Sequence, residues 1–153
     1  MRKFKIAVQQ YERIPLYGLW MDSSDRTIAK DIPSLSKQYH AVVGKAEDSI
    51  MPFYVLSKDY DEATGKFRLF IGSDSLVFGL EEFILEEGRY AKIIIRPKFG
   101  FLWGLAIGEA KRYFYTRWLP ESGFKARNME YEHHTEKSVG KGATVDLIFA
   151  ISE

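Results

Sequence analysis

Residues 53–72, FYVLSKDYDEATGKFRLFIG, contain two strand-like runs joined by a short polar loop. The runs are Phe53–Asp59 and Lys66–Gly72, and both are rich in aromatic and β-branched residues. The loop between them ends in Gly65, which can supply the positive φ that a tight turn requires. This stretch therefore predicts an antiparallel hairpin, and the rest of the chain can be aligned to it.

A similar hairpin pattern returns about 76 residues later, roughly half the length of the chain. Phe53–Asp59 then falls on Met129–Thr135, and Phe67–Ile71 falls on Ala143–Leu147. Few residues are identical between the two halves, so the repeat is one of hydrophobic and turn pattern and not of sequence identity. The sequence predicts two copies of one structural unit, at about residues 1–76 and 77–153, within a single domain.

Each hairpin is preceded by strand-like and helical patterns. Lys3–Val8 and Pro15–Trp20 predict strands, and a helical stretch near Ile32–Gly44 falls on Gly108–Pro120 at the same offset. Two such units must meet at a seam, which is where concave ligand sites commonly form.

The ends of the two helices can be predicted from individual residues. Asp31 is a candidate cap for the first helix, whose first turn holds Pro33, and Gly44 is its expected end. Phe99–Trp118 predicts the longest helix. Its glycines at 100, 104 and 108 each cost about 1 kcal/mol of helix propensity, which either close packing on the sheet or a ligand near the backbone would explain.

Composition and charge exclude several classes of function. The net charge is +1 without a basic block, so the footprint of a direct nucleic-acid binder is absent. The lack of cysteine excludes disulfides, thiolate metal sites and thiol catalysis. No stretch approaches a membrane span or the core of a signal peptide, so we expect a cytoplasmic protein that does not bind membranes.

Aromatic residues are unusually frequent, with 11 Phe, 9 Tyr and 3 Trp. They can fill a Phe- and Tyr-rich core or line a cavity between the two units. The candidates for the cavity are Trp103, Trp118, Tyr54 and Tyr90. Trp20 and Tyr113 are further candidates that could serve the core instead.

Glu132 is the most unusual polar residue because it lies inside a predicted strand. Alternation places Glu130, Glu132 and His134 on one face of that strand, and His133 on the other. This face is either solvated or lines a cavity, where a carboxylate could bind a cation or act as an acid or base. Adjacent histidines on a strand point to opposite faces, so we expect no metal site.

One motif resembles a known family. Trp118-Leu119-Pro120-Glu121-Ser122-Gly123-Phe124, followed by Tyr131-Glu132, resembles the GyrI-like effector-binding domain, which occurs in bacterial AraC- and MerR-type transcription regulators and as free-standing proteins. Gly88-Arg89-Tyr90-Ala91 matches the segment that opens the family's second repeat. His134 stands where the family commonly has a tyrosine, and the short spacing from Phe124 leaves Glu130 as an alternative to Glu132.

This resemblance implies an α+β fold in which two strand–helix–strand–strand units form a curved antiparallel sheet with two main helices and a central groove. It implies a free-standing sensor or sequestering protein that binds amphipathic or cationic aromatic compounds, including many drugs, at Glu132. Such a protein would need no cofactor, and would regulate transcription only through a separate protein partner.

The family leaves other functions open. Some members hydrolyse cyclopropane-bearing toxins, for which Glu132 would be the catalytic residue that activates water. Others inhibit a protein by binding it. A haem-binding relative of the same fold would use His40, His133 or His134 as an axial ligand.

Overall fold

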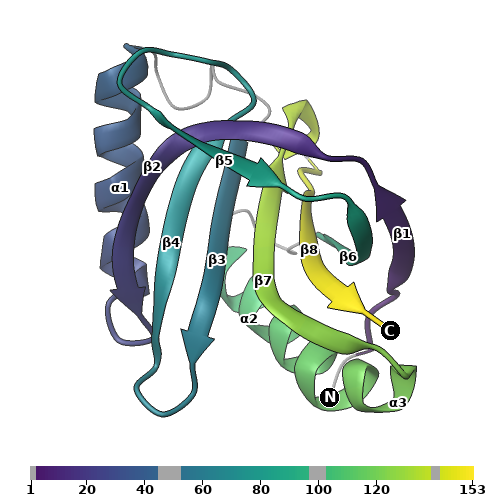
Figure 1. Cartoon of the computed structure of the whole chain (residues 1–153). Coiled ribbons are helices and arrows are strands. Elements are labelled where there is room, and N and C mark those ends of the chain that lie inside the picture. The colour runs from purple at the N-terminus through teal and green to yellow at the C-terminus, as the bar shows by residue number, and fades with distance from the viewer. Residues whose placement is uncertain (1–2, 45–52, 97–102, 139–141) are drawn as a thin grey trace.

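An eight-stranded antiparallel sheet forms the framework of the computed structural model, which describes residues 3–44, 53–96, 103–138 and 142–153. The sheet order is β1-β6-β8-β7-β3-β4-β2-β5 (Figure 1). The strands are β1 (Ala7–Tyr11), β2 (Ile14–Ser24), β3 (Phe53–Asp61), β4 (Lys66–Ser73), β5 (Glu81–Leu85), β6 (Gly88–Ile95), β7 (Lys125–His134) and β8 (Val145–Ser152). This arrangement confirms the predicted α+β fold.

The strand order shows the predicted duplication. Outward from the central β3–β7 pair, β3 is followed by β4, β2 and β5, whereas β7 is followed by β8, β6 and β1. Each unit therefore contributes strands in the same order on its own side of the junction. The outermost strands are exchanged, because β1 pairs with β6 of the second unit and β5 pairs with β2 of the first.

Two helical segments lie on one face of the sheet. The first is α1 (Ile28–Val43), and the second consists of α2 (Trp103–Tyr113), a π-helical turn η3 (Phe114–Trp118) and α3 (Leu119–Ser122). Figure 1 shows α2 behind β7 and β8, with α1 beside β2 and β4. A short 3₁₀ turn, η4 (Glu136–Ser138), joins β7 to the segment before β8. Among the described helices, none combines the length and apolar character that a membrane crossing requires.

The first helix begins earlier than the sequence predicts. Thr27, and not Asp31, occupies the N-cap position, and α1 begins at Ile28. Asp31 instead lies within the helix, where its carboxylate accepts hydrogen bonds from the hydroxyls of Ser23 (2.8 Å) and Thr27 (2.6 Å). These bonds tie the start of α1 to β2. The helix ends at Gly44 as predicted, with φ of +72°.

The first strand also differs from its prediction, since β1 begins at Ala7 instead of Lys3. It pairs with β6 only from Ala7 onward, opposite Lys92. The predicted helix start at Phe99 lies outside the described residues, as does Gly100. Gly104 and Gly108 do not pack closely on the sheet, because a Cβ added to either would meet no atom within 4 Å.

Three hydrophobic clusters hold the sheet and helices together. One lies under α2 and includes Ile93, Leu147 and Phe149, and a second lies under α1 and includes Leu35, Val55 and Ile71. The third cluster lies on the helix-free face, where Leu16 from one end of the sheet packs with Tyr90 from the other. The sheet therefore curls toward this face, which confirms the predicted curvature.

Candidate ligand-binding cleft

A row of side chains crosses six strands at the centre of the sheet. Cross-strand pairing gives the row Leu19–Ile71–Val55–Glu132–Leu147–Ile93. Directly paired residues of an antiparallel sheet point to the same face, and the members of this row belong to the clusters under the helices or line the cleft between them. Glu132 is the only polar member. It lies opposite Val55, at the junction of the two units.

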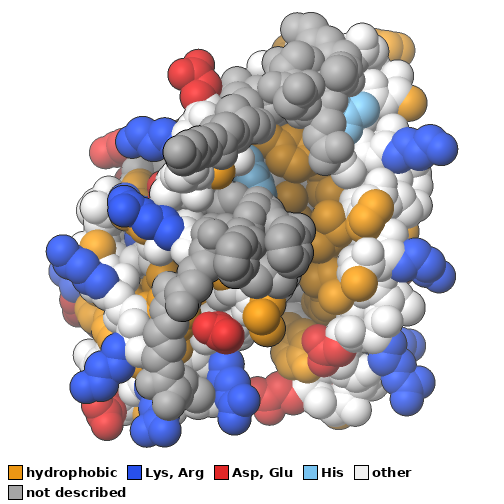
Figure 2. Space-filling view, turned by 180° about the vertical axis from the view of Figure 1, so that it is seen from behind, with side chains coloured by type: hydrophobic (Ala, Val, Ile, Leu, Met, Phe, Trp, Pro, Cys, Tyr) orange, Lys and Arg blue, Asp and Glu red, His pale blue; other side chains and the backbone are white. Residues whose placement is uncertain are grey.

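The two helices make a cleft over this row. Ile28 and Ile32 of α1 line one side and Lys111 of α2 lines the other, above Val55 and Glu132. Seen from the helix side, hydrophobic side chains gather in a hollow of the surface (Figure 2). The enclosed cavity is only about 10 Å³, room for about one water molecule.

Glu132 is held by one polar contact within the described residues. Its Oε1 atom lies 3.0 Å from Nε2 of His134, two residues along the same face of β7. The Glu132 side chain is 16% exposed and that of His134 is 24% exposed. A carboxylate that is this buried loses much of its hydration, which favours a cationic partner.

Glu130, the alternative candidate, lines the same cleft but has a cation of its own. Lys111 Nζ lies 3.7 Å from Glu130 Oε2, close enough for attraction but too long for a good hydrogen bond. Burial raises the pKa of Glu130, an effect that Lys111 opposes and that Glu132 increases. Its Oε2 atom has no hydrogen-bond partner among the described residues. Both predicted carboxylates therefore face the cleft, but Lys111 largely offsets the charge of Glu130.

Three predicted aromatic residues lie on the opposite face of the sheet from Glu132. Tyr54 and Tyr90 belong to the third cluster, on which Trp20 also packs. The ring of Tyr54 is stacked on His133, with centroids 4.6 Å apart and planes at 9°. Because Tyr54 and His133 neighbour the Val55–Glu132 pair in register, they must point away from its face. The structure does not bring these aromatics to the cleft.

The remaining predicted residues lie on the second helical segment. Trp118 packs on the cluster under α2, where its ring is stacked on Phe114 and Phe124. Tyr113 contacts Phe4, with ring centroids 5.6 Å apart. Trp103 is the first residue of α2, and its side chain lies outside the described part of the structure.

Sequence reasoning missed Ile28, Ile32 and Lys111 as lining residues of the cleft. The start of α1 was expected four residues later, which removed Ile28 from consideration. The signal for Lys111 was present, since a lysine on a predicted helix above two strand carboxylates is a candidate partner.

Comparisons with known proteins support the fold. No protein-family model matches the chain, and no curated protein matches its sequence. A putative bacterial transcription regulation protein from Staphylococcus aureus superposes with a TM-score of 0.72 at 11% identity, covering 99% of this chain and 100% of that chain. The structure of SAV2435 bound to tetraphenylphosphonium superposes with a TM-score of 0.69 at 10% sequence identity, covering 97% of this chain and 94% of that chain.

The C-terminal domain of EcmrR gives a TM-score of 0.64 at 14% identity, covering 98% of each chain. The similarity spans the whole curled sheet and both helical segments. The fold is therefore that expected for a GyrI-like effector-binding domain.

Proposed function

We propose that this protein binds amphipathic organic cations with aromatic groups, as a sensor or sequestering protein. The binding site is the cleft between α1 and α2. The observation that carries this proposal is the single carboxylate, Glu132, at the centre of an otherwise apolar row. The cleft combines apolar walls with the Lys111–Glu130 pair and the further carboxylate of Glu132. Such a surface favours a ligand that joins hydrophobic groups to a positive charge.

Glu132 is the main electrostatic determinant because the neighbouring Glu130 is offset by Lys111. Within the described residues, Glu132 is bonded to His134, and no lysine or arginine is paired with it. A cation about 4 Å from a carboxylate in a partly buried site gains roughly 4 kcal/mol of Coulomb energy. The cleft thus favours a cation over a neutral compound of the same shape.

The comparisons support this ligand class. SAV2435, which has the same fold, is bound to tetraphenylphosphonium, a cation surrounded by four phenyl groups. The likeness to a putative transcription regulation protein and to the EcmrR domain supports a regulatory role for ligand binding. A separate protein partner would transmit that signal.

The cleft must widen to accept such a compound, because its present cavity is about 10 Å³. Ile28 and Ile32 on α1 are apolar and can separate from the side of Lys111 without breaking a hydrogen bond between the two walls. The ligand then replaces contacts between the walls with contacts of its own.

Calorimetric titration with tetraphenylphosphonium tests the proposal. Glu132→Gln keeps the shape of the side chain but removes its charge, so binding should weaken by about 1–3 kcal/mol. The matched control is Glu62→Gln in the exposed β3–β4 loop, which removes the same charge and should bind as the wild type does. Equal affinity of the Glu132→Gln variant and the wild type would contradict the proposal.

The same carboxylate could activate a water molecule, so a second measurement separates binding from hydrolysis. Mass spectrometry after incubation with cyclopropane-bearing electrophiles should recover each compound intact if the protein only binds. Hydrolysed product with the wild type but not with Glu132→Gln would instead identify Glu132 as a general base.

A further inference from the structure

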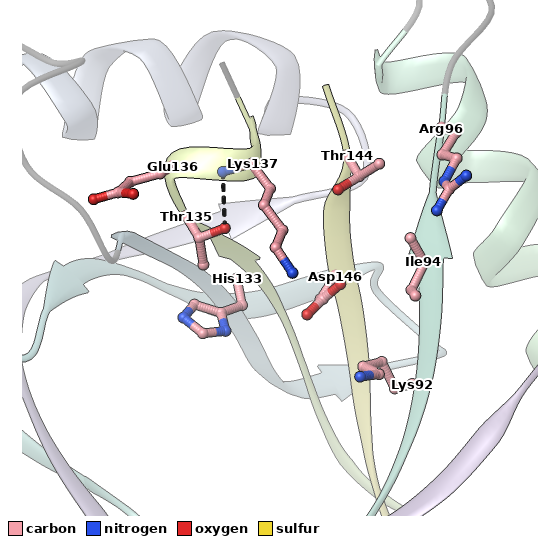
Figure 3. Close-up of a pocket in the computed structure, with 9 residues that line it drawn as sticks. All are labelled: Lys92, Ile94, Arg96, His133, Thr135, Glu136, Lys137, Thr144 and Asp146. Carbon is pink, nitrogen blue, oxygen red and sulfur yellow. Dashed lines mark hydrogen bonds between the residues drawn. The ribbon is translucent and has the colours of Figure 1, made fainter. Parts of the chain in front are cut away.

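A second cavity of about 480 Å³ lies on the helix-free face of the sheet (Figure 3). Its floor is a row of three paired residues, His133 of β7, Asp146 of β8 and Ile94 of β6. Since His133 follows Glu132 in the strand, this cavity and the cleft lie on opposite faces. The volume lies within the range of small-molecule sites, about 300–1,000 Å³.

Three basic side chains surround this cavity. Lys92 lies in β6, Arg96 directly follows that strand, and Lys137 lies in the η4 turn. Within the described ranges, none of the three side chains has an ion pair or hydrogen-bond partner. Like charges that converge on one cavity repel each other, and a bound anion would relieve that repulsion.

Two acidic side chains, Asp146 and Glu136, line the cavity, and only one of them points into it. Figure 3 shows the Asp146 carboxylate near the centre, with the Lys137 side chain reaching toward it. The Glu136 carboxylate points away from both. The centre of the cavity therefore presents several donors and one acceptor.

The rim that carries Lys137 is held by hydrogen bonds to Thr135, which directly follows β7, and to Thr144, which directly precedes β8. Ser138 Oγ donates to the carbonyl of Thr144 (2.7 Å), and the Thr135 backbone N–H donates to Ser138 Oγ (3.0 Å). The Thr144 N–H donates to the carbonyl of Lys137 (2.8 Å). In the floor of the cavity, the His133 ring is fixed by its stacking on Tyr54. The site is thus largely formed before any ligand arrives.

The first unit differs from the second at the pair that matches Lys92 and its partner. Lys92 pairs with Ile148 next to the Ile93–Leu147 pair, and the corresponding pair beside Leu19–Ile71 is Gly18–Gly72. Those two glycines are in such close contact that a Cβ on Gly18 would lie 2.1 Å from the Ile71 carbonyl oxygen. The fold therefore does not require a basic residue or an open space at this position.

We infer that the cavity binds a small organic anion that also carries a hydroxyl or amino group. Lys92, Arg96 and Lys137 would bind its carboxylate or phosphate group, since ammonium and guanidinium groups are the usual partners of such anions. Asp146 would accept a hydrogen bond from its hydroxyl or amino group. This inference does not depend on the function of the cleft.

Calorimetric titration with citrate and with glucose 6-phosphate tests the site. The double variant Lys92→Gln/Lys137→Gln should bind both at least tenfold more weakly, about the loss of one charge-assisted contact. The control Lys37→Gln/Lys125→Gln removes the same charge from exposed positions on α1 and β7 and should bind as the wild type does. Tetraphenylphosphonium binding should be the same in all three proteins.

A matched pair of ligands tests the role of Asp146. Tricarballylate has the three carboxylates of citrate without its hydroxyl, so the wild type should prefer citrate by about tenfold, the value of a hydrogen bond to a charged group. Asp146→Ala should remove that preference. Three results would overturn the inference. The first is a dissociation constant above about 1 mM for both citrate and glucose 6-phosphate with the wild type. The others are an equal loss of affinity in the two double variants, or equal affinity of the wild type for citrate and tricarballylate.

Discussion

The two halves of the sheet present almost the same side chains to the helices and differ at one central position. In the central row, the first unit has Leu19, Ile71 and Val55, and the second unit has Ile93, Leu147 and Glu132 at the corresponding positions. Val55 and Glu132 are paired with each other, so the difference lies at the junction. Apolar residues keep the duplicated framework, and the departure from the repeat marks the proposed site.

The helix-free face differs between the halves in a similar way. The Gly18–Gly72 pair allows close contact in the first unit, whereas Lys92 and Ile148 stand at the matching positions in the second. The first unit thus brings β2 and β4 into close contact at this pair, whereas the second carries Lys92, one of the residues that line the basic cavity. On both faces of the sheet, the proposed sites lie where corresponding positions of the two units carry different residues.

The largest expected effect of a substitution lies in the core under the second helical segment. Phe114 is fully buried, and its ring is stacked on Phe149 with centroids 3.8 Å apart. Phe114→Ala should lower the free energy of unfolding by about 3–5 kcal/mol in urea denaturation.

The buried aromatic of the first helix, Tyr39, is held differently, by a hydrogen bond of 2.9 Å to Ser73 Oγ. Tyr39→Phe keeps the ring and should cost only about 1 kcal/mol. Similar losses for the two variants would show that the helices are not anchored as described.

The glycine contact gives the next largest effect. A Cβ on Gly72 would lie 2.4 Å from the Tyr17 carbonyl oxygen, so β2 and β4 would have to separate. Gly72→Ala should lower stability by about 3 kcal/mol. Lys92 is the counterpart of Gly18, the partner of Gly72, and it already carries a long side chain. Lys92→Ala should therefore stay within about 0.5 kcal/mol of the wild type. A harmless Gly72→Ala would refute the close approach of these strands.

The buried carboxylate of Glu130 makes the stability of the fold depend on pH. Because burial raises the pKa of Glu130 above its ordinary value of 4.5 despite Lys111, the charged form costs stability. This cost is complete above the raised pKa and disappears as the pH falls below 4.5. Glu130→Gln should therefore be more stable than the wild type at pH 7 and no more stable at pH 4, as thermal unfolding can measure. A difference in stability between Glu130→Gln and the wild type that stays the same from pH 4 to pH 7 would contradict this prediction.

The smallest effect concerns the glycines of α2. Gly104 is exposed, and an added Cβ would meet no atom within 4 Å. Gly104→Ala should therefore raise stability by about 0.5–1 kcal/mol through helix propensity. If the variant instead keeps its stability but loses tetraphenylphosphonium binding, the glycine serves close approach of a ligand.

The sequence predicts the duplication, the hairpins and the strand that carries Glu132, because all of these follow from local periodicity. It does not predict which side chains share a face across two strands. Tyr54 was grouped with Glu132, but the pairing of Tyr54 with His133 places the tyrosine on the other face. Register of this kind depends on how the units pack and has no local signal.

Helix geometry limits the prediction in a second way. Trp118 was assigned to the cavity from an uninterrupted helical pattern, but η3 intervenes between α2 and α3. A π-helical turn has a wider spacing than an α-helix and rotates all following side chains. The basic cavity was missed because its cations come from β6, the residue directly after it, and η4, and the η4 turn is distant from β6 in the sequence.

The position of a bound cation in the protein decides whether the cleft between α1 and α2 is the binding site. Nuclear Overhauser effects between the phenyl protons of tetraphenylphosphonium and the methyl groups of the protein report contacts in solution. We predict contacts with Ile32, Val55 and Leu147, which line the cleft beside Glu132. Contacts with Leu16, Ile94 or Ile148 on the helix-free face instead would show that the cation binds elsewhere and that the cleft is not its site.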